Sequence, residues 1–383
     1  INMYQLNADE FNQEHFLREY WQKKPVVIRQ GFKHFQDPIS ADEIAGLACE
    51  EEVESRLVYK KGEQWQAEFG PFESYEHLGD KNWSLVVQAL DNWSEEAAQM
   101  IEPFRFLPHW RLDDLMVSFA TPGGGVGPHI DWYDVFICQG SGKRNWRVGD
   151  EGQHREFAAH AALLHVEPFE AMIDVELEPG DILYIPPGFP HEGITLETSL
   201  SFSVGFRTNS AVSLLSGFAD HLIDNEQGGQ LITDPERQAT ARSGAIDSND
   251  FAKIKQQLTS LTGNDEMLRD FIGAFYTQAK HELDLQPDLE LIADDDIKVA
   301  IAEHNLMRLG GVRAFYFPET LTEGICYIDG NKVEFSPAIA NIVQLMCDQV
   351  VISQEQLQPW INSSDFIAFV SEQLSAGYWY FAS

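Results

Sequence analysis

Two histidines and one aspartate are spaced so that they can hold a metal ion. His129 and Asp131 are separated by one residue, and His191 follows much further along the chain. Residues i and i+2 of a β-strand point to the same side, so His129 and Asp131 can bind one ion from one strand. The third ligand must then come from a neighbouring strand. Two histidines and a carboxylate are the ligand set that holds Fe(II) in non-haem oxygenases.

The segments before these residues contain the glycine and proline turns that are expected around a binding site. A lone His-x-Asp pair is common in proteins without a metal, so its context matters. The glycine-rich run 122–128 enters His129 directly, and glycine permits tight turns and a close approach of the backbone to a ligand. Pro179-Gly180-Asp181 begins one turn, and Pro186-Pro187-Gly188 begins another just before His191. This order of turn, strand, turn and histidine is typical of jelly-roll metal sites, so we predict that the three residues bind a metal.

Further polar residues share faces with these ligands or form a regular pattern. Tyr133 lies two residues after Asp131 and should point the same way, either lining the pocket or filling the barrel with its hydroxyl hydrogen-bonded. The run Ser199–Phe206 alternates small polar with apolar residues, as a strand does. Its serine face, with Ser201 and Ser203, would meet the substrate or a cosubstrate, or would form the solvent face of an outer strand.

A basic strand follows the first two ligands. Strand alternation separates its residues into two faces: Arg144, Trp146 and Val148 against Lys143, Asn145 and Arg147. A cation inside a barrel is costly unless it is paired, and a dicarboxylate such as 2-oxoglutarate would supply the partner. Arginine suits that task because its planar fork binds a carboxylate through two hydrogen bonds. Periodicity alone does not decide which face points inward, and a solvated basic strand is the alternative.

Several segments together resemble one family, the JmjC-type bacterial ribosomal oxygenases. The similarity runs from the N-terminal segment to the aromatic C-terminal end of the chain. The segments that carry it are Phe16–Ile28, Pro122–Phe136, Gly142–Gly149, Pro186–His191 and Gly377–Phe381. The His-x-Asp and Pro-Pro-Gly-x-Pro-His motifs also occur in wider JmjC and cupin groups, whereas their combination with these C-terminal regions is more specific.

The resemblance implies an Fe(II)- and 2-oxoglutarate-dependent protein hydroxylase with O2 as the second cosubstrate. By motif, His129, Asp131 and His191 would be the catalytic iron ligands, and Arg144 would bind the distal carboxylate of 2-oxoglutarate. Bacterial members hydroxylate the β-carbon of an arginine in the sixteenth protein of the large ribosomal subunit, and eukaryotic members hydroxylate histidines of other ribosomal proteins. The remaining alternatives are a cupin-type metalloenzyme acting on a small molecule and a binding protein without catalysis, such as a transcriptional regulator.

The chain divides into three predicted regions. Residues 1–208 form a mainly β catalytic domain, a cupin-like jelly roll of the JmjC type. Residues 209–295 are helical, with Ser210 as a helix N-cap, and the resemblance implies that they form a homodimer interface. Residues 296–383 form an α+β unit that resembles a winged helix, with a hairpin turn at Asp329-Gly330-Asn331. In the first region, Asp9 is the expected N-cap of the first helix.

Charge and composition indicate the class of partner. With 26 basic and 61 acidic residues the net charge is −35, which repels nucleic acid and attracts basic proteins such as ribosomal proteins. Acidity that serves only solubility is the alternative. No apolar run approaches the ~20 residues of a membrane span, and no secretory signal pattern is present. The four cysteines are scattered, which argues against a disulfide framework or structural zinc and favours a reducing cytoplasm.

Overall fold

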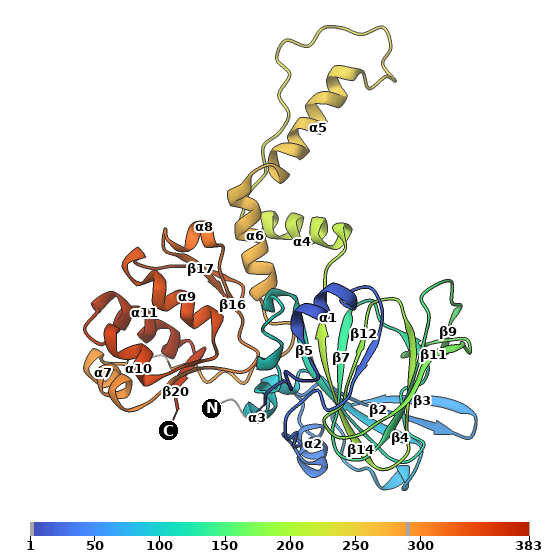
Figure 1. The fold of residues 1–383 in the computed structure, drawn as a ribbon. Helices are drawn as coiled ribbons and strands as arrows, with labels where there is room; N and C mark the ends of the chain where they lie inside the picture. The colour runs from blue at the N-terminus through green and yellow to red at the C-terminus, as the bar shows by residue number, and fades with distance from the viewer. Residues whose placement is uncertain (1–3, 289–291, 383) are drawn as a thin grey trace. The chain divides into compact units, whose positions relative to one another are not determined.

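The computed structural model describes residues 4–288 and 292–382. Residues 1–3, 289–291 and 383, which the predicted regions include, lie outside the described residues. The chain forms two compact units (Figure 1). The first comprises Ile1–Thr208, Ala279–Gln286 and Leu309–Val312, and the second comprises Asn209–Gln278, Pro287–Arg308 and Arg313–Ser383. Among the described helices, none is long and apolar enough to cross a lipid bilayer.

Two antiparallel sheets form the barrel of the first unit. The large sheet has the order β1 (Val26–Ile28), β12 (Ile182–Ile185), β7 (Asp134–Gln139), β14 (Ser199–Phe206), β5 (Leu112–Ala120), β4 (Trp83–Val87), β2 (Ser55–Lys61) and β3 (Gln64–Phe69). The small sheet has the order β11 (Ala171–Leu177), β8 (Arg144–Gly149), β13 (Pro190–Thr195) and β6 (His129–Ile130). The strands β9 (Glu156–His160) and β10 (Leu163–Val166) form a separate hairpin.

The middle of the large sheet is buried on both faces, as β7 shows. Val135 and Ile137 point into the barrel and pack with the small-sheet residue Trp146. Phe136 and Cys138 point outward into a second core, which is covered by N-terminal helices. Those helices are α1 (Gln13–Glu19), α2 (Ala41–Leu47) and α3 (Glu95–Ala98), accompanied by short 3-10 turns at Glu76–Leu78, Leu90–Asn92, Glu102–Phe104 and His109–Arg111. The period-2 pattern of a strand therefore serves two cores at once.

The N-cap predicted for the first helix is wrong by three residues. Helix α1 begins after Asn12, whose side chain accepts a hydrogen bond from the backbone N–H of His15. Asp9 lies in the preceding turn, where its own backbone N–H is bonded to the side chain of Asn7. Asn and Asp are equally good caps, so composition alone did not separate the two positions.

The second unit begins with helices. They are α4 (Ala211–Asp224), α5 (Ser248–Thr262), α6 (Asp265–Thr277) and α7 (Asp294–Glu303). The predicted cap of α4 is confirmed, because Ser210 accepts a hydrogen bond from Ser213 N–H. A small core of Phe218, Leu222 and Phe271 joins α4 to α6. In contrast, α5 has no buried residue.

The C-terminal part mixes short helices with two three-stranded sheets. One sheet has the order β19 (Val351–Ile352), β15 (Leu306–Arg308), β20 (Trp379–Phe381), and the other β16 (Ala314–Phe315), β17 (Ile325–Ile328), β18 (Asn331–Glu334). The helices are α8 (Pro318–Leu321), α9 (Ala340–Asp348), α10 (Gln354–Leu357) and α11 (Ser364–Ser375), with 3-10 turns at Pro337–Ile339 and Gln358–Trp360. The predicted hairpin is confirmed, with Asp329 and Gly330 at positive φ, 44° and 80°, as a two-residue turn requires.

Candidate metal and cosubstrate site

The three predicted metal ligands converge in the barrel. Strands β6 and β13 pair so that His129 lies directly opposite His191. One ligand atom from each of the three side chains lies within 4.8 Å of the other two. Asp131 Oδ2 is 3.7 Å from His129 Nε2 and 3.5 Å from His191 Nε2. The two Nε2 atoms and one carboxylate oxygen therefore surround a space that fits a single divalent cation.

Backbone carbonyls orient both imidazole rings in the same way. Nδ1 of His129 lies 2.8 Å from the carbonyl oxygen of Gly127, and Nδ1 of His191 lies 3.0 Å from that of Phe189. A carbonyl can only accept, so each Nδ1 carries the hydrogen and each Nε2 keeps its lone pair. Such bonds to the outer nitrogen fix the tautomer of metal-binding histidines. The tautomer suited to a metal is thus already set by the fold.

Charge balance at the triad also suits a cation. Burial alone would raise the pKa of Asp131, but His129 and His191 hold it well below its usual value. Burial would lower the pKa of His129, and the adjacent Asp131 carboxylate raises it instead. The carboxylate is therefore ionised and ready to act as a ligand.

A hydrogen bond joins the two halves of the ligand motif. The turn before His191 contains Gly188, whose N–H donates to the carbonyl oxygen of Asp131 at 2.8 Å. Gly188 has a φ of +87°, which residues with a side chain rarely adopt. The glycine of the Pro-Pro-Gly turn therefore serves the position of the second ligand as well as that of the third.

Arg144 points into the barrel, which settles the alternation of β8. Arg144, Trp146 and Val148 are all buried, with exposed fractions of 4%, 6% and 0%, so the solvated-strand alternative is wrong for this face. Arg144 Nε donates to Thr195 Oγ1 at 3.0 Å, and its Nη2 lies 3.4 Å from Ser118 Oγ. Within residues 4–288 and 292–382, Arg144 forms no ion pair with Asp or Glu.

A buried arginine without a carboxylate fits an anionic ligand. Burial lowers the pKa of Arg144 to about 10, so the guanidinium is still charged at neutral pH. Thr195 and His191 lie four residues apart on one face of β13, which corresponds to about 13 Å. A ligand that reaches both Arg144 and the triad must therefore be elongated and carry an anion at the arginine end. 2-Oxoglutarate meets both conditions.

The structure separates the two candidate serines. Ser201 is 2% exposed, pairs in register with Ser118 and donates to Gln139 Oε1 at 3.2 Å, so it lies towards the Arg144 end of the barrel. Ser203, in contrast, lines a cavity of about 270 Å³ together with Tyr133. Strand β14 lies between β5 and β7, so the outer-strand alternative for the serine face is wrong.

That cavity also contains charged residues that the sequence analysis missed. Its lining is Gln88, Asp113, Asp114, Met116, Tyr133, Val135, Ser203, Gly205, Arg207, Lys280 and His281. Asp113 pairs with Arg207 Nε at 2.7 Å and with Lys280 Nζ at 2.8 Å. Residues two and four positions after Ser203 are Gly205 and Arg207, so strand periodicity could have predicted that Arg207 points to the same side as Ser203. No local pattern marks Lys280, which comes from a distant part of the chain.

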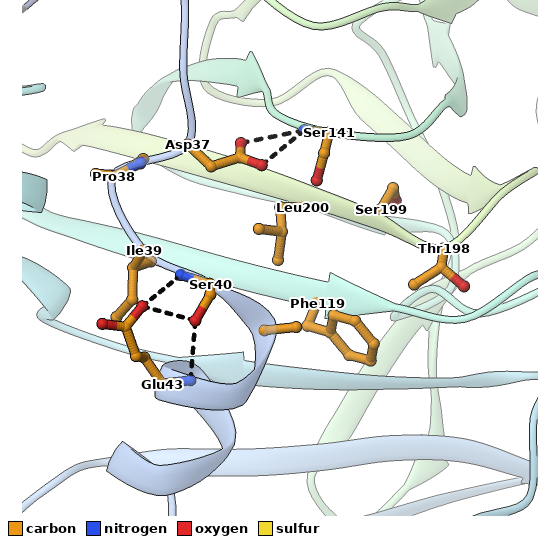
Figure 2. Close-up of a pocket in the computed structure, with 11 residues that line it drawn as sticks. Asp37, Pro38, Ile39, Ser40, Glu43, Phe119, Ser141, Thr198, Ser199 and Leu200 are labelled. Atoms are coloured by element: carbon orange, nitrogen blue, oxygen red, sulfur yellow. Dashed lines mark hydrogen bonds between the residues drawn. The ribbon is translucent and has the colours of Figure 1, made fainter.

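A larger cavity lies elsewhere in the first unit (Figure 2). It has a volume of about 520 Å³ and is lined by residues 37–41, Glu43, Phe119, Ser141 and 198–200. Both carboxylate oxygens of Asp37 accept from Ser141 N–H, at 3.1 and 3.3 Å, which closes one side. None of the predicted site residues lines it, so cavity size does not locate the chemistry in this protein.

Comparison with known proteins agrees with this geometry. The family model for the JmjC domain matches residues 99–214, and that for the ROXA-like winged helix matches residues 254–380. The chain is 44% identical to the ribosomal protein uL16 3-hydroxylase of Escherichia coli K12, over 96% of both chains. It is 34% identical to a probable ribosomal oxygenase of Haemophilus influenzae, over 76% of this chain and 74% of the relative.

Solved structures show the same similarity. The E. coli ribosomal oxygenase YcfD, in complex with cobalt and 2-oxoglutarate, superposes with a TM-score of 0.89 at 44% identity, covering 99% of this chain and all (100%) of the other. The predicted fold class, a JmjC jelly roll followed by a winged-helix-like domain, is thereby confirmed. The chain belongs to the JmjC-type ribosomal oxygenases.

Proposed function

We propose that this protein is an Fe(II)- and 2-oxoglutarate-dependent oxygenase that hydroxylates the β-carbon of an arginine in ribosomal protein uL16. The uL16 3-hydroxylase with 44% identity supports the substrate, and the structure of YcfD with cobalt and 2-oxoglutarate supports the cofactors. Fe(II) together with 2-oxoglutarate activates O2, so that one oxygen atom enters a C–H bond while 2-oxoglutarate becomes succinate and CO2.

The observation that best supports this function is a buried arginine, Arg144, in the same barrel as the triad and without an ion pair among the described residues. In this proposal His129, Asp131 and His191 hold the iron through Nε2, Oδ2 and Nε2. Arg144 binds the distal carboxylate of 2-oxoglutarate, with the Thr195 and Ser118 hydroxyls holding its guanidinium. A cupin acting on a small molecule would not need this arginine, and a protein without catalysis would not need the triad.

The cavity beside Tyr133 and Ser203 is the proposed substrate pocket. Its lining includes the carboxylate of Asp114, a group that suits a guanidinium, and that of Asp113, which is paired with Arg207 and Lys280. Burial and the nearby Asp131 carboxylate raise the pKa of Tyr133, so its phenol is neutral and can donate a hydrogen bond. The uL16 3-hydroxylase at 44% identity supports arginine over the alternative of histidyl hydroxylation. Ser201, also considered a substrate residue, is better placed to serve the cosubstrate end.

Mass spectrometry of a uL16 peptide tests this function. After incubation with enzyme, Fe(II), 2-oxoglutarate and O2, we expect a gain of one oxygen on an arginine, and no gain with His129→Ala. Formation of succinate without peptide oxidation would keep the oxygenase and discard the substrate. If neither product forms with wild-type protein, the oxygenase assignment itself fails.

We also propose that the chain acts as a cytoplasmic homodimer without bound nucleic acid. Support comes from apolar side chains that the helical region leaves in solvent: Val212 is 78%, Ile223 71%, Phe251 63% and Leu258 64% exposed. The net charge of −35 disfavours nucleic acid. A substrate class of ribosomal proteins and four free cysteines agree with a reducing cytoplasm. The predicted divisions at residues 208 and 295 form part of the same proposal.

Light scattering tests the dimer. We expect a particle of twice the chain mass of 43.4 kDa, and a particle of single mass for Phe251→Glu with Leu258→Glu. A wild-type particle of single mass at micromolar concentration would contradict the dimer.

A further inference from the structure

His165, far from the triad in the sequence, contacts the loop that carries His129. It lies on β10 and is 3% exposed. Its Nε2 is 2.8 Å from the carbonyl oxygen of Val126. The neighbouring Val166 N–H donates to the carbonyl oxygen of Pro128 at 2.9 Å. Two consecutive residues of β10 therefore hold the loop on both sides of Gly127.

The ring of His165 also lies against the α-carbon of Gly127. A side chain at position 127 would place its first carbon 2.2 Å from Cε1 of His165, closer than any real contact allows. Gly127 has a φ of +85°, a second reason for glycine here. The carbonyl of this same residue receives the Nδ1 hydrogen of His129 at 2.8 Å. His165 is thus one residue removed from the group that orients a metal ligand.

Packing alone does not explain a histidine at position 165. The ring edge meets Trp65 at a centroid distance of 4.8 Å and Phe157 at 6.3 Å, surroundings that an apolar side chain would fill equally well. Burying a polar ring is unfavourable unless its N–H is hydrogen-bonded. The Val126 carbonyl can only accept, so Nε2 carries the hydrogen and donates it. The hydrogen bond to the loop is therefore the property that distinguishes histidine from phenylalanine here.

We propose that His165 is a positioning residue for the metal site, which fixes the Val126–Pro128 segment so that the Gly127 carbonyl holds the His129 ring in its metal-binding orientation. This inference rests on the proposed role of His129 as a metal ligand. Loss of a group hydrogen-bonded directly to a metal-binding histidine typically weakens metal affinity by about 10- to 100-fold. His165 acts one residue further from His129, so the lower end of this range is expected for it.

Cobalt binding tests this role without requiring turnover. Co(II) affinity is measured from the d–d absorption of the wild type, His165→Phe and His165→Gln. His160→Phe is the matched control, since His160 belongs to the same hairpin and its Nδ1 accepts from Ala162 N–H rather than contacting the loop. We expect about 10-fold weaker binding for His165→Phe with an altered absorption band, the lower end of the range for a direct partner of a metal ligand. Glutamine retains an N–H donor and should restore affinity to within about threefold, and the control should bind normally.

The Co(II) affinities of the variants and the wild type distinguish the possible outcomes. Equal Co(II) affinity in His165→Phe and the wild type would overturn the inference, as would equal losses in the phenylalanine and glutamine variants. Absence of Co(II) binding by the wild type would instead contradict the proposed metal site itself. If His165→Phe does not fold, His165→Met replaces it, because methionine also fills the space without an N–H donor.

Discussion

Arg144 donates a hydrogen bond of 3.0 Å to the hydroxyl of Thr195, and no carboxylate of the described chain neutralises it. The bond crosses from β8 to β13, at the register position where Arg144 faces Thr195. The hydroxyl fixes the direction of the guanidinium without removing its charge. The guanidinium of Arg144 is therefore available to bind an anionic ligand.

Removing this cation should impair cosubstrate binding selectively. Hydrogen bonds to charged groups contribute about 1.5–3 kcal/mol, so Arg144→Met should raise the KM for 2-oxoglutarate by about 10- to 150-fold. Arg144→Lys keeps the charge but loses the planar fork, so its KM for 2-oxoglutarate should lie between those of the wild type and Arg144→Met. Succinate release as a function of 2-oxoglutarate concentration measures both. A normal KM in Arg144→Met would contradict the assignment, and unchanged Co(II) affinity is the control.

Divalent metal should stabilise the folded protein through the triad. At a Co(II) concentration of about 100 times Kd, binding adds about 2.7 kcal/mol to the free energy of unfolding. Chelation with EDTA should abolish both this gain and turnover, and added Fe(II) should restore turnover. Asp131→Ala should show no gain, because the remaining two imidazoles lack the anionic ligand. Equal stabilisation of Asp131→Ala and wild type in denaturant titrations would place the metal elsewhere.

Two serines on one face of β14 allow the substrate and cosubstrate ends to be tested separately. Ser203→Leu fills the cavity beside Tyr133, and we expect the KM for the uL16 peptide to rise at least about tenfold, a cost of 1.4 kcal/mol, with little change for 2-oxoglutarate. Ser201→Leu lies next to Gln139 at the other end and should have the reverse effect. Initial rates with either ligand varied distinguish the two. The same effect from both variants would mean that the two ends are not separate.

A buried carboxylate network makes a prediction about stability. Tyr184 donates to Asp134 at 2.6 Å and accepts from Gln22 N–H at 2.8 Å, which ties the N-terminal segment to β7. Tyr184→Phe leaves Asp134 less well bonded and should lower the free energy of unfolding by about 1–3 kcal/mol. Tyr75→Phe, which loses a bond to the neutral Ala45 carbonyl, should cost less. Chemical denaturation measures both, and a larger loss for Tyr75→Phe would contradict the argument.

The same network should give stability a defined pH dependence. Burial raises the pKa of Asp134 despite its bonds to Tyr184 and Gln22. The folded protein therefore binds a proton more readily than the unfolded chain, so this contribution is present below the unfolded pKa and is lost as pH rises through the folded pKa. Unfolding free energies of wild type should fall relative to Asp134→Asn across that interval. A constant difference would refute the shift.

Sequence patterns located the chemistry well where strand periodicity applies. The i, i+2 rule predicted that His129 and Asp131 bind one ion from one strand. Strand β6 ends at Ile130, so Asp131 lies just beyond it, but its Oδ2 is still 3.7 Å from His129 Nε2. Pairing of β6 with β13 supplies the third ligand opposite the first. The two-residue turn at Asp329 and Gly330 followed from local conformational preference. The turn and the shared side of His129 and Asp131 depend on close neighbours in the chain, which the sequence contains.

Features that depend on tertiary contact were not predictable in the same way. Alternation in β8 left Arg144 and Arg147 equivalent, and only the facing sheet decides which one is buried. Lys280 reaches Asp113 across 167 positions of sequence, and nothing near either residue indicates the other. Asp9 and Asn12 are equally good caps by type, so the choice between them depends on how the preceding turn packs.

The arrangement of β14 has a consequence for how specificity changes. Ser201 lies towards the Arg144 end and Ser203 lines the cavity beside Tyr133, so in the proposed function neighbouring positions of one face would contact different ligands. A lineage can therefore exchange the residue at 203 and acquire a new protein target while its cosubstrate requirement stays the same. Diversification of target choice within a constant reaction would follow from one strand that serves both the substrate and the cosubstrate end.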